Sequence, residues 1–562
     1  MANGANRLGR AGGAFDPGRD GPERLALVTW FVYVGLLVVV AATLAAAFAR
    51  SAPDHDSIQA IGAARSLAAG TGYASPIPYY ELQHAAAPTL PVPQTIFPPG
   101  GAVALGAAIA AGVAPAIAPM VAALLALLVS VETLRRLLRA AGCPATVAAA
   151  AALAWLAHPR IWELVRGGST EAAYVACCLL ATLGVVRAME ARRPVPWLLA
   201  AGVAGAAAVM VRYIGAVQVA ALAMVVALAF RRDGFVRMLE RVTAFALLPA
   251  LATVALLARN RLLSGRLTGG QFEHPDAPGW IGALAATREA MRMAMALPSV
   301  PWAGGAVVVA MIASLLAATL WALRIAVAPD PGRDPDGGAR RGAARVVLAC
   351  MAGVAAQGAF LLWNTATVAE WFASWRYLLP LVPLSIVALV SAAAGGGRGT
   401  ALARLQGAAL AAVTLLAIGL AVREHGITTP LAKTRVEIGR ALDLRCGDGS
   451  VRDRIERQRV AGTPILSTEE HFVHLETGAH VIGTTSRFYT RRTWTPEAVA
   501  ALMASFGARE VIVLREMLPR RAPAFVGSPF HEALVAGRVP AGFELVCEAA
   551  GVTVLRAPAP AR

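Results

Sequence analysis

Apolar runs separated by basic or Pro- and Gly-rich breaks occupy most of the chain between residues 25 and 422. Many of these runs are roughly 18 to 25 residues long, the length that a helix needs to cross the hydrocarbon core of a bilayer. The run at 101–113 is too short to cross and is predicted to be a re-entrant or interfacial helix. The other runs predict a mainly α-helical polytopic membrane protein with about 11 spans, at residues 25–49, 115–134, 144–158, 169–186, 196–211, 214–230, 243–257, 302–327, 346–363, 378–394 and 405–422.

Basic residues between the spans predict how the bundle is oriented in the membrane. Clusters such as Arg135, Arg136 and Arg139 recur after alternate spans, and cytoplasmic loops carry an excess of Lys and Arg. If the run at 101–113 does not cross the membrane, all of these basic clusters lie on the cytoplasmic side. The transmembrane domain then covers 24–422, after a disordered cytoplasmic tail at 1–23, and its large outer loops are 51–99 and 259–300. We therefore expect a multi-pass protein of the plasma (inner) membrane.

The composition changes to charged and mixed residues at 423–562. Strand-like runs at 463–468, 480–485, 509–515, 543–547 and 552–556 flank a helix that begins after Thr495 and ends at Gly507. These elements predict a small soluble α/β domain on the extracytoplasmic side. Two of the six cysteines, Cys446 and Cys547, could pair there, but their spacing does not decide it.

The composition agrees with a membrane protein. With 57% hydrophobic and 15% charged residues, the chain is far more apolar than a soluble globular protein. A net charge of +17 would suggest a nucleic-acid partner for a soluble protein. Here many arginines lie in short loops beside apolar spans, so membrane orientation explains the charge and no nucleic acid is expected.

Ionisable residues gather on the predicted outer side of the bundle. A charge near hydrocarbon is costly unless it is paired or hydrated, so such residues are functional candidates. Asp54 and Asp56 begin a short amphipathic helix, with Gln59 and Arg65 expected on its polar side. The other members of the outer set are Glu163, Arg166, Glu171, Arg212, Tyr213, Arg259, Asn260, Glu370, Arg376 and Tyr377.

These residue types favour chemistry at a lipid phosphate. Arginine forks bind phosphate oxygens and stabilise a phosphate leaving group. A carboxylate at a helix N-terminus can accept a proton from a hydroxyl, so Asp54 and Asp56 are catalytic candidates. Asp56 could instead be only an N-cap, and an Arg beside a Tyr is often a membrane anchor. The acid pair could also hold a divalent cation, Mg²⁺ or Mn²⁺, but it supplies few of the oxygens required.

Several stretches carry a family resemblance. DHDSIQAIGAARSLAAGTGY at 54–73, followed by PPGG at 98–101, resembles the first outer loop of GT-C glycosyltransferases, in particular the protein O-mannosyltransferase and aminoarabinose lipid A transferase group. STEAAYVACC, VRYIG, ARNRLLSGRLTGG and WRYLLPLVPL resemble further outer segments of that group. The chain departs from the pattern at Ala60, where many members have Tyr, and in its long loop 79–95, which leaves the acceptor site open.

The resemblance implies an inverting transferase that moves a sugar from a polyprenyl-phosphate donor to a lipid, polysaccharide or protein acceptor outside the cytoplasm. It implies a general-base role for Asp56, phosphate contacts for Arg212 and Arg376, and a positioning role for Glu171. Further substrate-binding candidates are Arg65, Tyr213, Arg259 and Tyr377. The nearer members of the family do not generally require a metal.

Two other classes of function stay open. A transporter or flippase of a lipid-linked saccharide should carry ionisable groups in the middle of its spans and show related halves, and the sequence has few such charges and no evident repeat. A non-catalytic anchor for the C-terminal domain would leave the outer arginines and carboxylates without a role. The transferase reading requires Asp56, Arg212 and Arg376 to face one cavity.

Overall fold

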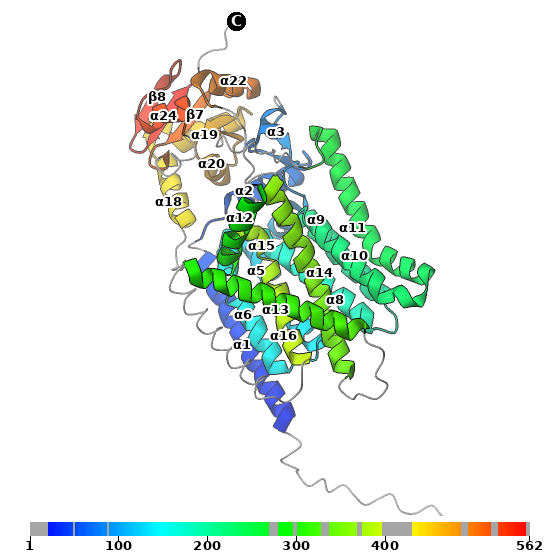
Figure 1. Ribbon diagram of the computed structural model, residues 1–562. Helices are drawn as coiled ribbons and strands as arrows, with labels where there is room; N and C mark the ends of the chain where they lie inside the picture. Colours follow the sequence, from blue (N-terminus) through cyan, green and yellow to red (C-terminus); the bar gives the residue numbers. More distant parts are fainter. Residues whose placement is uncertain are drawn as a thin grey trace, which may run out of the picture.

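A computed structural model describes residues 21–48, 51–86, 89–268, 279–295, 301–327, 337–367, 374–395, 430–484, 493–518 and 526–557. The protein is mainly helical, as the sequence predicts. A helical bundle forms the lower part of the molecule in Figure 1, and a small domain containing a sheet lies above it. Helix α2 (His55–Ala68), next to the predicted acid pair, lies between these two parts.

The bundle helices differ widely in length. They are α1 (Gly21–Phe48), α5 (Ala118–Ala140), α6 (Ala145–Leu156), α7 (Pro159–Gly167), α8 (Glu171–Glu190), α9 (Val195–Val211), α10 (Gly215–Phe230), the 3-10 turn η1 (Arg231–Asp233), α11 (Phe235–Ser264), α12 (Gly279–Ala294), α13 (Pro301–Val327), α14 (Gly337–Thr367), α15 (Trp375–Leu378) and α16 (Leu381–Gly395). Seven helical segments of the described chain are long and apolar enough to cross a membrane: α1, α8, α10 with η1, α11, α13, α14, and α15 with α16. The protein is therefore a multi-pass membrane protein.

The predicted number of eleven spans is not confirmed. The runs at 144–158 and 196–211 form α6 and α9, which are apolar but shorter than the seven long segments. The run at 405–422 lies outside the described residues, as does most of the predicted tail at 1–23.

Helix α8 lies inside the bundle, packed between α5 and α9. Most of its side chains are buried, whereas α1, α11 and α13 expose most of theirs. The exposed side chains of these outer helices are apolar, for example Val38, Leu251 and Leu320. Such a surface is unfavourable in water and suits contact with lipid tails.

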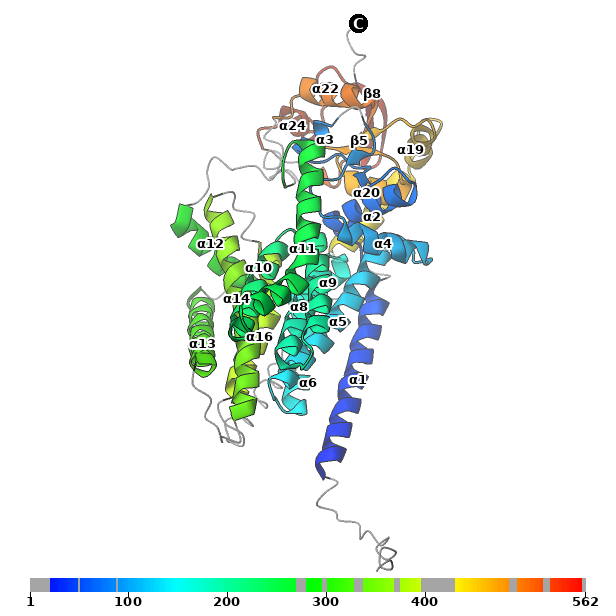
Figure 2. The same ribbon diagram turned by 90° about the vertical axis from the view of Figure 1, so that its right-hand side faces the viewer.

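The short apolar run before α5 does not cross the bundle. It forms α4 (Gly100–Ala110), which packs on α2 and on α5. Figure 2 shows α4 lying across the upper end of α1 rather than alongside it. The prediction of a non-spanning helix at this place is confirmed.

The second predicted outer loop, 259–300, contains more helix than expected. Helix α11 continues to Ser264 and ends at Gly265, which has a left-handed conformation. Residues Arg259 and Asn260 therefore lie in a helix and not in a loop. No helix breaker stands between Leu257 and Gly265, so the helix continues beyond its apolar part. Helix α12 occupies a further part of the same loop.

The C-terminal domain has a five-stranded sheet with the strand order β6-β5-β7-β9-β8. Strands β5, β6 and β7 are parallel, and β9 is antiparallel to β7 and to β8. The strands are β5 (Ile465–Ser467), β6 (Val481–Gly483), β7 (Glu510–Leu514), β8 (Glu544–Ala549) and β9 (Val552–Arg556), beside a two-stranded hairpin of β3 (Arg445–Cys446) and β4 (Gly449–Ser450). The helices are α18 (Pro430–Leu442), α19 (Val451–Val460), α20 (Glu470–Thr477), α22 (Pro496–Phe506) and α24 (Pro529–Val535).

All five predicted strands and the predicted helix are confirmed. Thr495 is the N-cap of α22 and accepts a hydrogen bond from the Ala498 amide, and Gly507 ends the helix in a left-handed conformation. The structure also pairs Cys446 with Cys547 in a disulfide, with Cα atoms 5.7 Å apart, which the sequence had left open.

The first outer loop and the C-terminal domain form a single packed unit. The loop contains α3 (Glu81–His84) and a small hairpin of β1 (Ala74–Ser75) and β2 (Val92–Pro93). Val481 N donates to Pro76 O over 3.2 Å, and Gly483 N donates to Pro78 O over 3.0 Å, so the loop extends the sheet beyond β6. A shared core joins Ile58 of α2 to Phe472 of α20.

This contact corrects one prediction about α2. Gln59 was expected on a polar, exposed face, but its side chain is buried. Its amide donates to Ile77 O over 3.2 Å and lies 3.3 Å from His471 Nε2, and it accepts from the Ser75 hydroxyl over 2.6 Å. The face that looks polar in sequence is therefore the face that binds the loop and the C-terminal domain.

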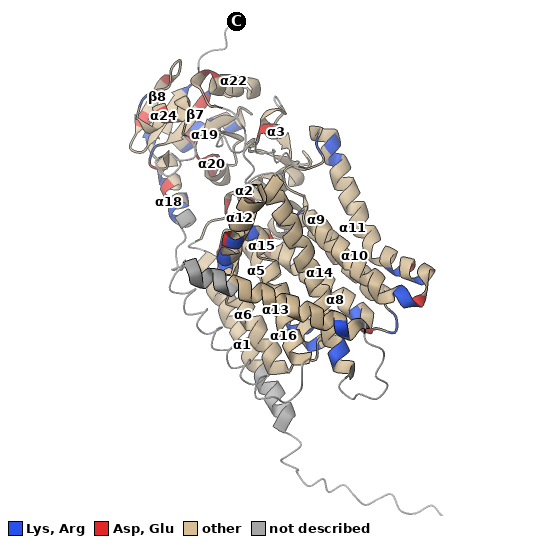
Figure 3. Ribbon diagram, viewed as in Figure 1, with Lys and Arg blue, Asp and Glu red and all other residues tan. Residues whose placement is uncertain are grey.

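Basic residues mark the end of the bundle away from this domain. Figure 3 shows Lys and Arg at the ends of α8, α13 and α14 that lie far from the C-terminal domain, and at η1. This is the charge distribution that the sequence predicts for a cytoplasmic face.

Candidate active site

Three acids meet one arginine at the upper end of the bundle. Arg376 Nη2 lies 3.2 Å from Asp54 Oδ2 and 3.2 Å from Asp56 Oδ2. The same nitrogen donates to the Ser169 hydroxyl over 2.8 Å and lies 3.2 Å from Glu171 Oε2, and Nε lies 2.9 Å from Glu171 Oε1. Four segments far apart in the sequence thus supply one polar cluster, consisting of Asp54, Asp56, Ser169, Glu171, Arg212 and Arg376.

The acid pair is held by the first turn of α2. Asp54 is the N-cap, and its carboxylate accepts the Ser57 amide over 2.8 Å. The Asp54 amide donates to Gly167 O over 2.8 Å, and the Ser57 hydroxyl donates to Gly168 O over 2.8 Å, so the turn between α7 and α8 fixes the start of α2. The N-cap alternative for Asp56 is therefore wrong: Asp56 lies in the first turn of α2, where the helix dipole favours its charge.

Glu171 and Arg212 form a buried ion pair behind Arg376. Glu171 begins α8, its side chain is 3% exposed, and its Oε1 lies 2.6 Å from Arg212 Nη2. The Ser169 hydroxyl donates to the other carboxylate oxygen. Arg212 is the C-cap of α9, and its guanidinium lies 5.9 Å from the centre of the Tyr377 ring. An acid buried this deeply needs such partners to stay in the folded protein.

The break between α9 and α10 directs Arg212 toward the cluster. Gly215 follows three residues later and begins α10. A Cβ atom at Gly215 would lie only 2.5 Å from the Ala208 carbonyl carbon, so the two helices can approach this closely only with glycine. This packing explains why the VRYIG stretch at 211–215 ends with glycine.

Both guanidinium groups keep donors free for a ligand. The Nε atom of Arg212 is buried and has no hydrogen-bond acceptor among the described residues. The Nε atom of Arg376 lies 2.9 Å from Glu171 Oε1 but makes no hydrogen bond of good geometry with any described residue. Arginine N–H groups bind phosphate oxygens, often two at a time. The cluster therefore offers an anion site beside carboxylates.

The two aspartates differ in environment. Burial raises the pKa of Asp54, although the positive charge of Arg376 acts in the opposite direction. One Asp54 oxygen is occupied by the Ser57 amide and the other faces Arg376. Asp56 has no such cap contact and lines a cavity on its other side. Asp56 is thus the better placed of the two to meet a substrate hydroxyl.

Other predicted site residues lie elsewhere. Tyr213 donates to Thr95 O over 2.9 Å and accepts from Asn260 over 2.8 Å. Arg259 donates to Gln94 O over 2.8 Å and to Tyr73 O over 3.0 Å. These three residues hold the first outer loop against α11.

The remaining outer charges also lie apart from the cluster. Arg65 points to the C-terminal domain, with its Nη1 3.5 Å from His474 Nε2. Glu163 pairs with Arg160 over 2.7 Å. Arg166 is buried in α7, and Glu370 lies outside the described residues.

The donor set does not fit a resident divalent cation. Among the described residues, no group of three or more His, Cys, Asp or Glu side chains is arranged to hold a metal. The Arg376 guanidinium already lies against both aspartates and supplies the positive charge. A cation such as Mg²⁺ would require about six oxygens in octahedral geometry. The possible Mg²⁺ or Mn²⁺ site at Asp54 and Asp56 therefore gains no support.

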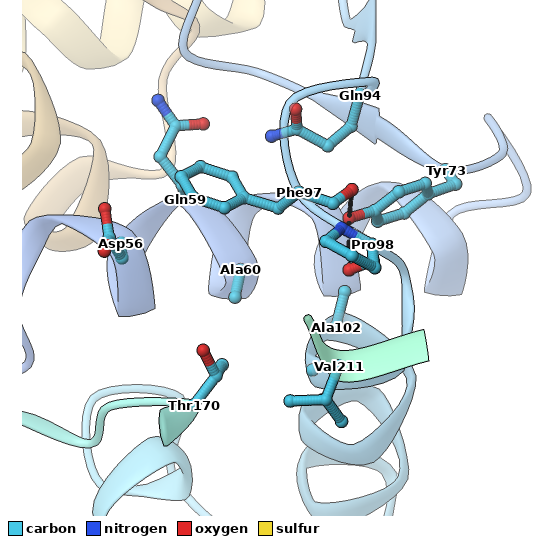
Figure 4. Close-up of a pocket in the computed structure, with 11 residues that line it drawn as sticks. Asp56, Gln59, Ala60, Tyr73, Gln94, Phe97, Pro98, Ala102, Thr170 and Val211 are labelled. Carbon is cyan, nitrogen blue, oxygen red and sulfur yellow. Dashed lines mark hydrogen bonds between the residues drawn. The ribbon is translucent and has the colours of Figure 1, made fainter. Parts of the chain in front are cut away.

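The residues that line a cavity beside Asp56 were not predicted as a group from the sequence. Figure 4 shows a cavity lined by Asp56, Gln59, Ala60, Tyr73, Gln94, Phe97, Pro98, Gly101, Ala102, Thr170 and Val211. Four of these residues belong to the PPGG stretch or are adjacent to it in the sequence. The glutamines carried no signal in the sequence, because their approach depends on the fold of a long loop.

Comparisons with known proteins bear on the fold of the chain. No protein-family model matches the chain, and neither does any curated protein sequence. The crystal structure of ArnT from Cupriavidus metallidurans bound to undecaprenyl phosphate is similar, with a TM-score of 0.55 and 13% identity over 94% of this chain and 98% of that one. The arabinofuranosyltransferase AftD from Mycobacteria matches with a TM-score of 0.51 and 17% identity over 93% of this chain and 41% of that one. The chain therefore has the fold of the GT-C glycosyltransferases.

Proposed function

We propose that this protein is a membrane glycosyltransferase that moves a sugar from a polyprenyl-phosphate donor to an acceptor hydroxyl, with inversion and with Asp56 as general base. The observation that carries the proposal is the contact of Asp56 with Arg376 over 3.2 Å at the wall of a cavity. This contact supports the proposal, because a carboxylate that can accept a proton lies beside a guanidinium that can bind a phosphate. ArnT, which shares the fold, was crystallised with undecaprenyl phosphate.

The reaction needs one bond to form and one to break. The acceptor oxygen attacks the anomeric carbon of the donor sugar, and the bond from that carbon to the phosphate oxygen breaks. The phosphate leaves with the electron pair, and the hydroxyl proton passes to the Asp56 carboxylate. A positioned general base contributes typically 10²–10⁴-fold to such a step.

Arg376 and Arg212 would stabilise the departing phosphate. Their unengaged N–H groups can donate to its oxygens as negative charge develops there. Glu171 and Asp54 keep the two guanidinium groups in place through ion pairs, so little reorganisation is needed during the reaction. Glu171 is thus assigned as a positioning residue.

We assign the site to the extracytoplasmic face of the plasma membrane. Lys and Arg at the far ends of α8, α13 and α14 and at η1 lie at the opposite end of the bundle, which favours that end as cytoplasmic. The Cys446–Cys547 disulfide lies in the domain above the site, and disulfides persist mainly outside the cytoplasm. The acceptor would be a lipid, polysaccharide or protein, and the bundle would lie in lipid.

A transporter of lipid-linked saccharide is less well supported. Its ionisable groups should lie within the spans. The buried polar network deep in the bundle consists of uncharged side chains, with Gln357 donating to Gln218 over 2.6 Å and Tyr174 donating to Gln357 over 3.2 Å. The ionic cluster lies instead at the mouth of the bundle, where a transferase needs it.

Transfer of a radiolabelled sugar from polyprenyl phosphate, measured in membranes, tests the proposal. The Asp56→Asn variant should lose at least about 100-fold of the activity, because a general base is removed. The matched control is Glu163→Gln, another carboxylate at the same face that lies outside the cluster. Undiminished transfer by Asp56→Asn would remove Asp56 as the base.

A further inference from the structure

The turn that carries the acid pair also contacts the C-terminal domain. His55, which lies between Asp54 and Asp56 in the sequence, stacks its ring on that of His471, with ring centres 4.8 Å apart and planes 22° apart. The ring of Phe472 makes an edge-to-face contact with His55 at 5.7 Å. Both partners belong to α20, which packs on α2 and lies beside it in Figures 1 and 2. The C-terminal domain therefore touches the residue between the two acids.

The His471 ring is held in one orientation by buried hydrogen bonds. Its Nδ1 donates to Glu470 Oε1 over 2.9 Å, and the side chains of His471 and Glu470 are 2% and 0% exposed. With Nδ1 as the donor, Nε2 is left as an acceptor. The Gln59 amide nitrogen lies 3.3 Å from this Nε2 and can donate to it. A chain of contacts thus leads from Glu470 to α2.

The first turn of α2 is held on two opposite faces. His55 and Gln59 are four residues apart, so they share the face that meets His471. Ser57 is two residues from each of them and points nearly the opposite way, because successive residues of a helix differ by about 100° in direction. On that side the Ser57 hydroxyl donates to Gly168 O over 2.8 Å. The bundle holds one face of the turn, and the C-terminal domain holds the other.

The direction of the Asp56 carboxylate depends on how this turn is rotated about the helix axis. Asp56 follows His55, so its side chain leaves the helix about 100° around the axis from the stacked ring. Its Oδ2 lies 3.2 Å from Arg376 Nη2. A rotation of the turn would move this oxygen relative to the guanidinium, and reactions of this kind are sensitive to small displacements of a reacting group.

We propose that His471 is a positioning residue for the reaction. Through its stack on His55 and its contact with Gln59, it fixes the rotation of the first turn of α2 and hence the direction of Asp56. The proposal rests on the transferase function and deepens it. It gives the C-terminal domain a direct part in the chemical step, besides any part in binding an acceptor.

Sugar transfer at saturating donor and affinity for undecaprenyl phosphate, both measured on the purified full-length protein, test this role. His55→Ala removes the stacked ring, whereas His55→Phe keeps a ring in its place. The matched control is His84→Ala. His84 also joins the first outer loop to the C-terminal domain, with its Nε2 3.0 Å from Gly483 O and its ring against Trp494, but it lies outside α2.

His55→Ala and His471→Ala should each lower kcat about tenfold without changing the affinity for undecaprenyl phosphate, because the base is misdirected and the phosphate site is intact. His55→Phe and His84→Ala should keep kcat within about threefold of the unmodified protein. Since His471 acts through the same turn, the double variant of His55 and His471 should lose little more than either single variant.

Hydrogen exchange at the Ser57 amide, which donates to Asp54, gives a readout that does not depend on activity. It should become faster in His55→Ala and in His471→Ala but not in His84→Ala, because only the first two loosen the turn. This measurement also separates misdirection of the turn from general unfolding of the C-terminal domain.

The proposal is overturned if His55→Ala keeps its kcat, if His55→Phe is as slow as His55→Ala, or if His84→Ala loses as much activity. Losses that multiply in the double variant would also overturn it. Failure of the transferase function looks different, because the unmodified protein then transfers no sugar. In that case faster exchange at Ser57 still supports the hold of His471 on the turn, and unchanged exchange overturns it.

Discussion

Arg376 Nη2 lies 3.2 Å from Asp56 Oδ2, although one residue belongs to the end of the described bundle and the other to the first outer loop. The contact joins the proposed base to the proposed phosphate site. It also means that a phosphate entering the cluster shares Arg376 with the acids. The fork of the guanidinium makes this sharing possible, because it has five N–H donors.

Replacing Arg376 by Lys should reduce transfer at least about 100-fold, because an ammonium group cannot bridge several acids and a phosphate at once. The measurement is the initial rate of sugar transfer by purified protein. Arg160→Lys is the matched control, since Arg160 lies at the same face and, among the acids that the structure describes, pairs only with Glu163. Equal activity of the two variants would contradict the assignment of Arg376.

Replacing Glu171 by Gln should lower the free energy of unfolding by about 3 kcal/mol, since one buried partner is removed and Arg212 is left uncompensated. Thermal unfolding in detergent measures this loss. Glu456→Gln, which breaks an exposed pair with Arg459, should leave the melting temperature nearly unchanged. Equal melting temperatures would show that the buried pair does not stabilise the bundle.

The contact between α2 and the C-terminal domain should weaken in acid. Burial lowers the pKa of His474 to about 3. Its Nδ1 donates to Ala479 O over 2.7 Å, so the neutral ring leaves Nε2 as an acceptor toward Arg65. An unfolded His titrates near about 6.5 and binds more protons below that pH. Its contribution is complete above pH ~6.5 and is lost as the pH falls toward ~3.

Stability measured between pH 7 and 4 tests this expectation. His474→Asn retains a donor to Ala479 O without a titrating ring, so its melting temperature should depend less on pH in this range. A pH profile identical to that of the unmodified protein would contradict the role of His474.

Replacing Gly215 by Ala should destabilise the break between α9 and α10, because the added Cβ would approach the Ala208 backbone to 2.5 Å. Overpacking of this kind costs typically about 1–3 kcal/mol. Gly439→Ala in α18, where no atom lies within 4 Å of the new Cβ, is the control. Unchanged stability and activity of Gly215→Ala would show that Arg212 does not depend on this packing.

Local patterns in the sequence predicted much of this fold. The lengths of the apolar runs located the membrane helices and the non-spanning α4. The capping residues Thr495 and Gly507 predicted where α22 begins and ends. The positions of the basic clusters between the spans predicted that Asp54, Glu171, Arg212 and Arg376 lie at one face of the bundle. The structure brings these four residues together.

Features that depend on distant contacts could not be predicted. The burial of Gln59 depends on His471, which lies in another domain. Asp54 rather than Asp56 is the N-cap of α2, because the backbone of the turn between α7 and α8 fixes where α2 begins. The Cys446–Cys547 disulfide depends on the packing of β3 against β8, which belong to different sheets.

The central claim is that Asp56 acts in the chemical step and that the arginines hold the phosphate. It is tested most directly by measuring, on one preparation of Asp56→Asn, both its affinity for undecaprenyl phosphate and its rate of sugar transfer at saturating donor. The account predicts an affinity within about threefold of the unmodified protein and a rate reduced at least about 100-fold. A rate that survives, or a rate loss explained entirely by weaker lipid-phosphate binding, would contradict it.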